Sequence, residues 1–170
     1  MSEEKRTSVS HQFEPVFDEH SRILILGTFP SVKSRENHFY YGHPQNRFWK
    51  LMARITCEEV PESIEEKKIL LLRSGIAIWD VIASCRITGS SDSSIRDVVP
   101  TDLARVLEHS PIERIYANGT TAKKLYERFS QEQTGRPIIG LPSTSPANAA
   151  YSMDRLMETW GKILEKSNEM

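Results

Sequence analysis

Hydrophobic residues along this chain gather in short unbroken runs, and four of these runs predict strands. They cover residues 23–26, 76–79, 112–117 and 137–141, and a turn-forming or polar residue follows each of them. Within the runs, apolar and polar positions do not alternate. The strands should therefore be buried on both faces, as in a parallel sheet covered by helices on its two sides.

Between and after these runs, apolar residues recur three and four positions apart, which is typical of helices with one buried face. This spacing predicts helices around 46–56, 67–73, 103–107, 122–129 and 153–164. Ser63 and Glu66 form a capping box ahead of the second helix, and Gly75 follows its end.

The order of strands and helices predicts an α/β fold, namely a three-layer α/β/α domain with a central, mostly parallel sheet of about four strands. We expect a single domain over residues 1–170, with residues 1–11 flexible. In such sheets a ligand binds outside the carboxyl ends of the strands. The candidate site therefore consists of residues that follow positions 26, 79, 117 and 141.

Composition narrows the class of protein. A chain of 170 residues with 38% hydrophobic content can bury one core, and its polar first residues favour neither a signal peptide nor a membrane anchor. We therefore expect a cytosolic protein. Cys57 and Cys85 should be free and half-buried. No cluster of histidines, cysteines or carboxylates has the spacing of metal ligands, so no metal or cofactor is expected.

The formal net charge of -1 argues against a protein that coats nucleic acid through its overall field. A local phosphate-binding surface remains compatible with the sequence. Lys33, Arg35, Arg47 and Lys50 gather around one motif, although an ordinary solvated surface would have the same composition.

Three segments carry candidate chemistry. Residues 27–31 (GTFPS) follow the first strand, residues 39–49 are rich in aromatic and hydrogen-bonding groups, and residues 141–148 (LPSTSPAN) form a proline-stiffened loop of small residues. A base flipped out of DNA needs a flat face to stack on and fixed polar atoms around its edge, which the second segment offers. Small residues in the third segment allow close approach to a phosphate. The alternatives are aromatics that only fill the core, and a plain structural turn.

Together, and in this order, the segments resemble the uracil-DNA glycosylase superfamily. Residues 27–31 resemble its first motif, 43–49 (HPQNRFW) resemble the same stretch of mismatch-specific uracil glycosylases, and 141–148 resemble the loop that pinches DNA and wedges into the duplex. The resemblance runs from about residue 23 to 164. It implies a DNA partner, base flipping and hydrolysis of an N-glycosidic bond.

One departure from the superfamily pattern indicates the branch. Where most relatives have an Asn or Asp that positions the attacking water, this chain has Phe29, which can neither donate nor accept a hydrogen bond. With residues 40–42 and 143–148, the first motif resembles the hypoxanthine-DNA glycosylase branch. That resemblance implies catalytic roles for Asn46, which would orient the water or the sugar, and for Asn118. The alternative is that Asn46 only caps the helix that begins at Arg47.

The resemblance also assigns residues to the base. Phe29 would line the base pocket, Tyr41 would stack on the extruded base, and Ser143 would contact it. Asp80 aligns with the base-reading Asn of uracil-specific relatives, but an ionised carboxylate cannot both donate and accept, so it suits uracil poorly. The alternatives are a core tyrosine at position 41 and an Asp80 that caps the next helix.

The remaining candidates would contact the DNA around the base: Ser31, Arg47, Ser145, Ala147 and Asn148. Ala147 falls near the wedge position and is small. Opening of the duplex should then depend on a base pair that is already weak, because mismatched bases are extruded at lower cost. His43 is more simply explained as a structural residue than as a general acid.

The sequence thus predicts a monofunctional, monomeric DNA-deoxyinosine glycosylase that releases hypoxanthine from single- or double-stranded DNA and leaves an abasic site, since no lysine occupies a motif. Three alternatives stay open: a uracil or mismatch-specific glycosylase, a catalytically silent module that binds damaged DNA, and an enzyme acting on free nucleosides.

Overall fold

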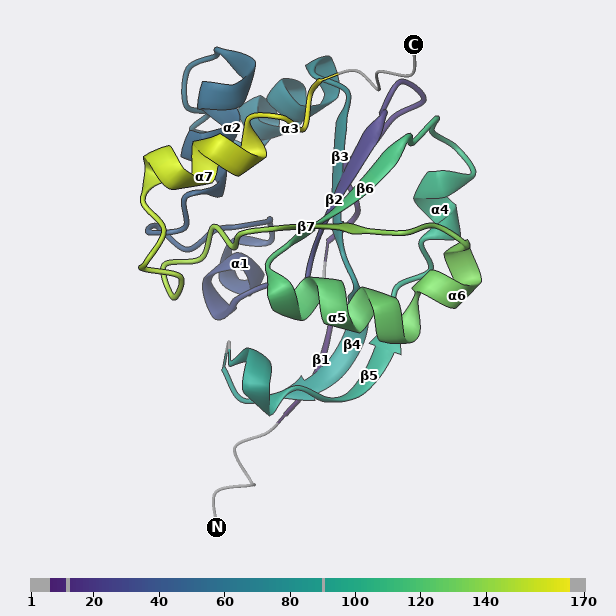
Figure 1. Ribbon diagram of the computed structural model, residues 1–170. Coiled ribbons are helices and arrows are strands. Elements are labelled where there is room, and N and C mark those ends of the chain that lie inside the picture. Colours follow the sequence, from purple (N-terminus) through teal and green to yellow (C-terminus); the bar gives the residue numbers. More distant parts are fainter. Residues whose placement is uncertain (1–6, 12, 90, 166–170) are drawn as a thin grey trace.

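The computed structural model describes residues 7–11, 13–89 and 91–165. Its main sheet is parallel, with the strand order β3-β2-β6-β7 (Figure 1). The strands are β2 Ile23–Gly27, β3 Ile76–Asp80, β6 Arg114–Asn118 and β7 Ile139–Leu141. Each overlaps one of the four predicted runs, although β6 and β7 begin two residues later than predicted. Every residue of β2 and β3 is buried, but the predicted burial of the last strand is wrong, because β7 lies at the sheet edge with Ile139 and Gly140 exposed. The predicted parallel sheet is confirmed.

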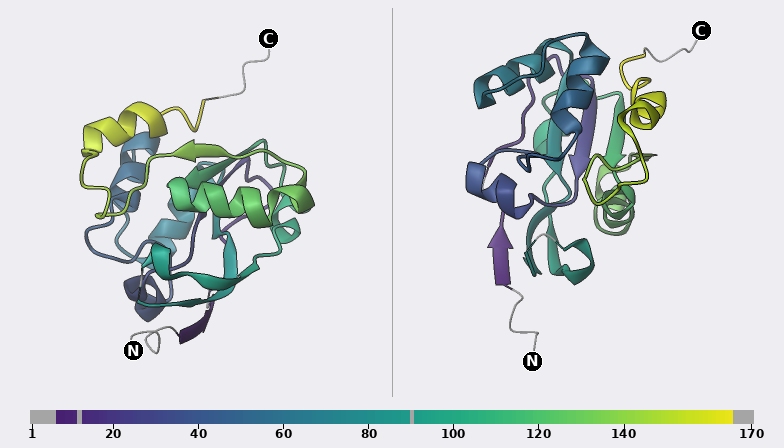
Figure 2. Two further views of the ribbon diagram at one scale, coloured as in Figure 1. Left: turned by 60° about the horizontal axis from the view of Figure 1, so that its bottom comes forward. Right: turned by 90° about the vertical axis from the view of Figure 1, so that its left-hand side faces the viewer.

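Helices cover both faces of this sheet (Figure 2). The longer ones are α2 Phe48–Thr56, α3 Ile64–Arg73, α5 Thr120–Phe129 and α7 Met153–Trp160. On one side α3 packs on β3, on the other α5 packs on β6 and β7, and α7 packs on α2. The shorter helices are α1 Val32–Asn37, α4 Ala104–Leu107 and α6 Gln131–Thr134. The three-layer architecture is confirmed, while α1 and α6 were not predicted.

A second, antiparallel sheet was also not predicted. It has the order β1-β4-β5, with β1 Thr7–Ser10, β4 Ile82–Ile87 and β5 Arg96–Pro100, and a 3₁₀ turn at Asp92–Ser94 precedes β5. Residues 7–10 were expected to be flexible, and this is wrong, because β1 pairs along its whole length with β4. Residues 1–6 of that segment lie outside the described residues. The capping alternative for Asp80 is also wrong, because a strand and not a helix follows it.

The two cysteines differ in their burial. Both are free, as predicted, but neither is half-buried: Cys57 ends α2 in a left-handed, exposed position, whereas Cys85 is buried beside Ile82 and Ile87. Within the described ranges, no helix is long and apolar enough to cross a membrane. The same part of the chain has no group of three or more His, Cys, Asp or Glu side chains that could hold a metal ion.

The strand register brings the candidate segments to one edge of the sheet. Gly27 at the end of β2 is level with Asp80 at the end of β3, and Asn118 at the end of β6 is level with Leu141. The chain leaves β2 towards β3 on one side and later returns to β6 on the other. The carboxyl ends of β2 and β6 therefore flank the point where a parallel sheet usually binds its ligand.

Candidate active site

A cavity of about 350 Å³ opens at this edge of the sheet, a volume in the range of small-molecule sites. Residues from all three motif segments line it. Of the predicted site residues, nine contribute to the lining: Phe29, Ser31, Tyr41, Asn46, Asp80, Asn118, Ser143, Ser145 and Ala147. The two that do not are Arg47 and Asn148.

The two asparagines are joined through Thr144, a fully buried residue of the 141–148 loop. Asn118 Nδ2 donates to Thr144 Oγ1 at 3.0 Å, and Thr144 Oγ1 donates in turn to Asn46 Oδ1 at 2.8 Å. The backbone N–H of Thr144 donates to Asn118 Oδ1 at 3.0 Å. This relay fixes the orientation of both amides and ties the ends of β6 and α2 to the loop.

Asn46 also supports the start of α2: it lies one residue before the N-cap position, Arg47, and its Oδ1 accepts from the backbone N–H of Phe48, the first helical residue, at 2.9 Å. The capping alternative and the site prediction are thus both compatible with the geometry. Since Oδ1 already accepts two hydrogen bonds, the group that Asn46 can offer a ligand is its Nδ2 amide, which only donates.

Most aromatics of the second segment belong to the core, as the alternative interpretation held. Phe39, Tyr40, Phe48 and Trp49 are all buried. Tyr41 differs in being only partly buried: it lines the cavity, as Tyr40 also does, while its ring stacks on Phe48 with centroids 4.0 Å apart. Its backbone adopts φ 54°, a left-handed conformation that is uncommon outside glycine and is frequent at functional sites.

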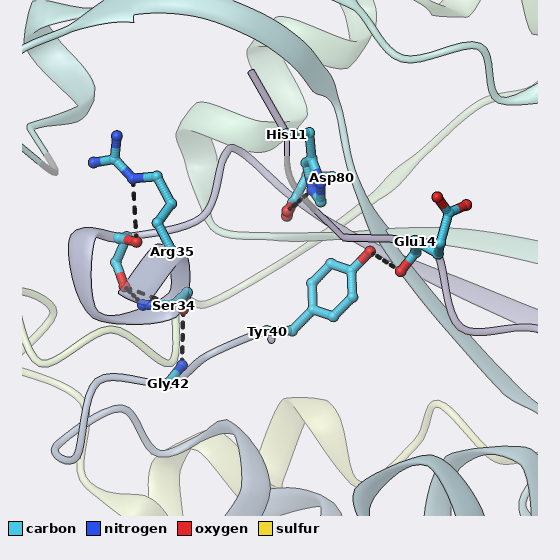
Figure 3. Close-up of polar contacts among 8 residues, drawn as sticks. His11, Glu14, Ser34, Arg35, Tyr40, Gly42 and Asp80 are labelled. Carbon is cyan, nitrogen blue, oxygen red and sulfur yellow. Dashed lines mark hydrogen bonds and ion pairs between the residues drawn. The ribbon is translucent and has the colours of Figure 1, made fainter. Parts of the chain in front are cut away.

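The hydroxyl of Tyr41 is buried and has no hydrogen-bond partner among the described residues. Burial, followed by the negative charge of Asp80, raises the pKa of Tyr41 far above its ordinary value, and the neighbouring Asn118 offsets this only in part. Burial likewise raises the pKa of Tyr40, whose hydroxyl donates to the Glu14 carbonyl at 2.8 Å (Figure 3). Both phenols therefore stay neutral at physiological pH.

Asp80 lies beside Gly27 at the base of the cavity. A Cβ on Gly27 would come within 2.4 Å of Asp80 Oδ1 and 3.0 Å of Tyr41 Oη, so only glycine leaves room for both side chains. The other carboxylate oxygen, Oδ2, lies 2.8 Å from His11 Nε2 (Figure 3).

The first motif turns into α1 through a serine network. Ser31 caps α1 by accepting from the Ser34 backbone N–H at 3.1 Å, and Ser34 Oγ accepts from the Gly42 N–H at 2.8 Å (Figure 3). Arg35 donates to the Gly89 carbonyl at 2.6 Å and lies over the ring of Phe29. The first two motif segments are thereby held against each other on one side of the cavity.

Arg47 holds the 141–148 loop in place. Its guanidinium donates to the carbonyls of Thr144, Ser145, Asn148 and Tyr151. These bonds use four of the five N–H donors of an arginine, which revises the predicted DNA contact: the charge of Arg47 faces its own loop.

The loop also braces itself. Asn148 Nδ2 donates to the Ser143 carbonyl at 3.0 Å, and Ser145 Oγ accepts from the Ala147 N–H at 3.1 Å. Ala147 is exposed at the rim of the cavity. On the far side of the loop a second groove is lined by Asn148 together with Lys123, and it shares Ser143, Ser145 and Ala147 with the cavity. The 141–148 loop thus separates the cavity from the second groove.

Comparison with known proteins agrees with this geometry. The family model described as the uracil DNA glycosylase superfamily matches residues 14–164. The chain belongs to this superfamily. As the sequence predicted, it is therefore a DNA glycosylase, a hydrolase of N-glycosyl bonds.

Individual relatives of this DNA glycosylase include two proteins named hypoxanthine DNA glycosylase. The one from Methanosarcina acetivorans is 36% identical over 152 residues, which cover 88% of this chain and 95% of the relative. The one from Methanosarcina barkeri is 42% identical over 87 residues, 50% of this chain and 54% of the relative. A solution NMR structure of a candidate uracil DNA glycosylase from M. acetivorans superposes with a TM-score of 0.78 at 34% identity, covering 93% of this chain and 97% of the other.

Sequence reasoning missed several residues of the site, among them Ser34 and Ser91, which line the cavity, and two that hold its side chains, Thr144 and His11. Thr144 stood inside a recognised motif, but only the structure shows that it bridges the asparagines. His11 lies in the segment expected to be flexible, and it reaches Asp80 from a distance of 69 positions in the chain. The β-branched residues Thr7 and Val9, which alternate with serines, were a weak signal for a strand there.

Proposed function

We propose that this glycosylase releases hypoxanthine from deoxyinosine in DNA, by hydrolysis without a lyase step, and leaves an abasic site. We also propose that the enzyme is a monomer and that it acts on the chromosome in the cytosol. One observation supports it above the others: Asn46 and Asn118, linked through Thr144, converge on the cavity that also holds Phe29, Tyr41 and Asp80. The relative named hypoxanthine DNA glycosylase that this chain matches over 95% of its length agrees with the proposal.

In the proposed reaction the base enters the cavity after it is flipped from the stack. Water adds through its oxygen to C1′ while the bond from C1′ to the base breaks, and the electron pair of that bond leaves with the base. The base takes up one proton, and a hydroxyl remains on the sugar. Such a step needs a placed water and donors for the developing charge more than a strong base.

The amide of Asn46 can supply such a donor. Its Nδ2 is the free half of a side chain whose Oδ1 is held by Phe48 and Thr144, so the amide is fixed before substrate arrives. Asn118 would stabilise the same arrangement from the buried side. Phe29 leaves no carboxylate at the position that most relatives use for the water, so the asparagines carry this duty in our proposal.

Around the base, Tyr41 and Phe29 would provide apolar contacts, and Asp80 and Ser143 would contact polar atoms of its edge. Ser31, Ser145, Ala147 and Asn148 would approach the flanking DNA from the two loops. Of the described residues that line the cavity, none is a lysine, and so none offers the amine that a lyase step would use.

Base release from matched duplexes tests the proposal. Duplexes that carry one deoxyinosine, one deoxyuridine or neither would be incubated with the protein, and alkaline cleavage would reveal abasic sites. We expect cleavage at deoxyinosine. Uracil-selective cleavage would favour the uracil or mismatch-specific alternative, binding without cleavage would favour a silent module, and release from free deoxyinosine would favour a nucleoside hydrolase.

A further inference from the structure

His11, directly after the N-terminal strand β1, reaches Asp80, which lines the base cavity, and nothing in the proposed reaction uses this histidine. The antiparallel pairing of β1 with β4 carries it there, and its backbone N–H continues the pairing by donating to the Ala83 carbonyl at 2.7 Å. The rings of Phe13 and Phe29 meet the imidazole edge-on, with centroids 4.7 and 6.1 Å away. Its side chain is only 7% exposed. The position of the imidazole is therefore fixed from several directions.

The two oxygens of Asp80 have different surroundings. Oδ2 lies 2.8 Å from His11 Nε2. Because an ionised carboxylate only accepts, the hydrogen of this contact is on Nε2. No residue in the described ranges forms a hydrogen bond to Oδ1, which lies beside Gly27 at the cavity. One oxygen of the carboxylate is thus occupied, and the other is an acceptor available to a ligand.

A fixed acceptor distinguishes hypoxanthine from adenine and uracil from cytosine, the bases from which they form by deamination; guanine and thymine also carry a ring N–H, so the contact selects only against adenine and cytosine. Hypoxanthine presents an N–H at N1, and uracil presents one at N3, next to a carbonyl. Adenine and cytosine have an acceptor nitrogen at the corresponding places, which a carboxylate oxygen repels. A carboxylate that could rotate freely would lose part of this discrimination, because the energy of a hydrogen bond falls steeply with misalignment.

We infer that His11 is a positioning residue: it holds Asp80 so that Oδ1 accepts the N1–H that hypoxanthine presents and adenine lacks, which makes the N-terminal strand part of the base-reading site. This inference rests on the proposed function. The inference deepens that proposal by naming the group of hypoxanthine that the site reads, N1–H, and the residue through which the N-terminal strand acts.

Single-turnover release of hypoxanthine from a deoxyinosine duplex would be measured for a set of variants. His11→Leu removes the donor to Asp80. His11→Gln keeps an N–H at nearly the place of Nε2. Asp80→Asn, whose oxygen His11 would hold, turns an NH₂ towards the base. The double variant His11→Leu/Asp80→Asn completes the cycle. His20→Leu makes the same substitution at a side chain that is 79% exposed, and it serves as the matched control.

We expect His11→Leu to slow release by about tenfold or more, the effect of one charge-assisted hydrogen bond. His11→Gln should recover most of the rate, His20→Leu should leave it unchanged, and the double variant should be no slower than Asp80→Asn, because His11 acts through Asp80. Thermal unfolding would show that each variant folds. His11→Asn, whose amide is too short to reach Oδ2, would replace His11→Leu if that variant does not fold.

Three results would overturn the inference: an unchanged rate in His11→Leu, the same further loss from His11→Leu in the Asp80→Asn background, or a folded His11→Gln as slow as His11→Leu. A wild-type protein that leaves deoxyinosine intact would instead overturn the proposed function. The wild-type measurement alone therefore separates the two failures.

Discussion

Asn46 combines a structural and a chemical duty in one side chain. Its Oδ1 caps α2 and accepts from Thr144, and its Nδ2 is left for the substrate. Replacement by alanine should remove roughly 3 kcal/mol of transition-state stabilisation, and should also cost about 1 kcal/mol of unfolding free energy through the lost cap. Single-turnover rates and urea denaturation would measure these two effects.

The two duties can be separated with Asn46→Asp, which keeps the capping oxygen but loses the amide donors. We expect this variant to be as stable as the wild type and as slow as Asn46→Ala, with DNA binding largely retained in both. An Asn46→Asp variant with full activity would mean that the oxygen, and not Nδ2, does the chemistry.

Thr144 should matter because its hydroxyl both accepts from Asn118 and donates to Asn46. Thr144→Val keeps the shape but leaves the buried Nδ2 of Asn118 without its partner and removes one of the two hydrogen bonds to Asn46 Oδ1. We therefore expect a loss of about 1–3 kcal/mol in unfolding free energy and slower base release. Thr144→Ser retains the hydroxyl and is the control. Equal behaviour of Val and Ser would argue against the relay.

Gly27 is needed for space and not for an unusual backbone conformation. A methyl group there would lie 2.4 Å from Asp80 Oδ1, and Asp80 is held by His11, so the carboxylate or the strand must shift. We expect Gly27→Ala to lower stability by about 1–3 kcal/mol and the rate of base release by about a hundredfold. Gly89→Ala, at a position where a methyl group would meet nothing within 4 Å but φ is 58°, would report the effect of backbone strain alone.

Single residues show where sequence reasoning stopped. Asn46 and Tyr41 could be chosen because a motif segment carries them, and Asp80 and Asn118 because each follows a predicted strand; all four line one cavity. The role of Arg47 could not be predicted from the sequence, since an arginine in this position can face either a DNA phosphate or its own loop. That choice depends on backbone carbonyls about a hundred positions away in the chain.

Among the elements, the 141–148 loop depends on α2 for its shape. Arg47 joins them by donating to four carbonyls, which lysine cannot reproduce from a single ammonium group. Arg47→Lys should therefore loosen the loop, with faster hydrogen exchange at residues 143–151 and slower base release. Arg54→Lys is the matched control, because Arg54 lies on the same helix and makes one exposed ion pair with Asp154. Unchanged exchange in Arg47→Lys would contradict this role.

The elements that could be predicted are those with a strong local pattern. Strands β2 and β3 of the parallel sheet are buried on both sides and appear as unbroken apolar runs, whereas the edge strand β7 is exposed at Ile139 and Gly140. The antiparallel sheet has no such signal: β1 and β5 are largely exposed, and β1 finds its partner β4 more than seventy positions later in the chain. It is this sheet, with its long-range pairing, that brings His11 to the cavity.

For the whole molecule, the buried tyrosines determine how stability changes in alkali. Burial raises the pKa of Tyr41 in the folded state above the value near 10 that it has when unfolded. Ionisation of Tyr41 should therefore not change the unfolding free energy below about pH 9. It should lower the unfolding free energy above pH 10, where only the unfolded chain releases the phenol proton. The difference in unfolding free energy between the wild type and Tyr41→Phe should be constant up to pH 9 and then shift against the wild type. A difference that stays constant to pH 11 would contradict the buried, neutral phenol.

The identity of the base released from DNA tests the proposed hypoxanthine glycosylase activity most directly. The most direct test incubates the protein with equimolar deoxyinosine and deoxyuridine duplexes and identifies the free base by mass spectrometry, with Asn46→Ala in parallel. We predict hypoxanthine in excess over uracil from the wild type, and little of either from the variant. Uracil alone, or no free base from a folded wild-type protein that still binds the duplex, would contradict the account.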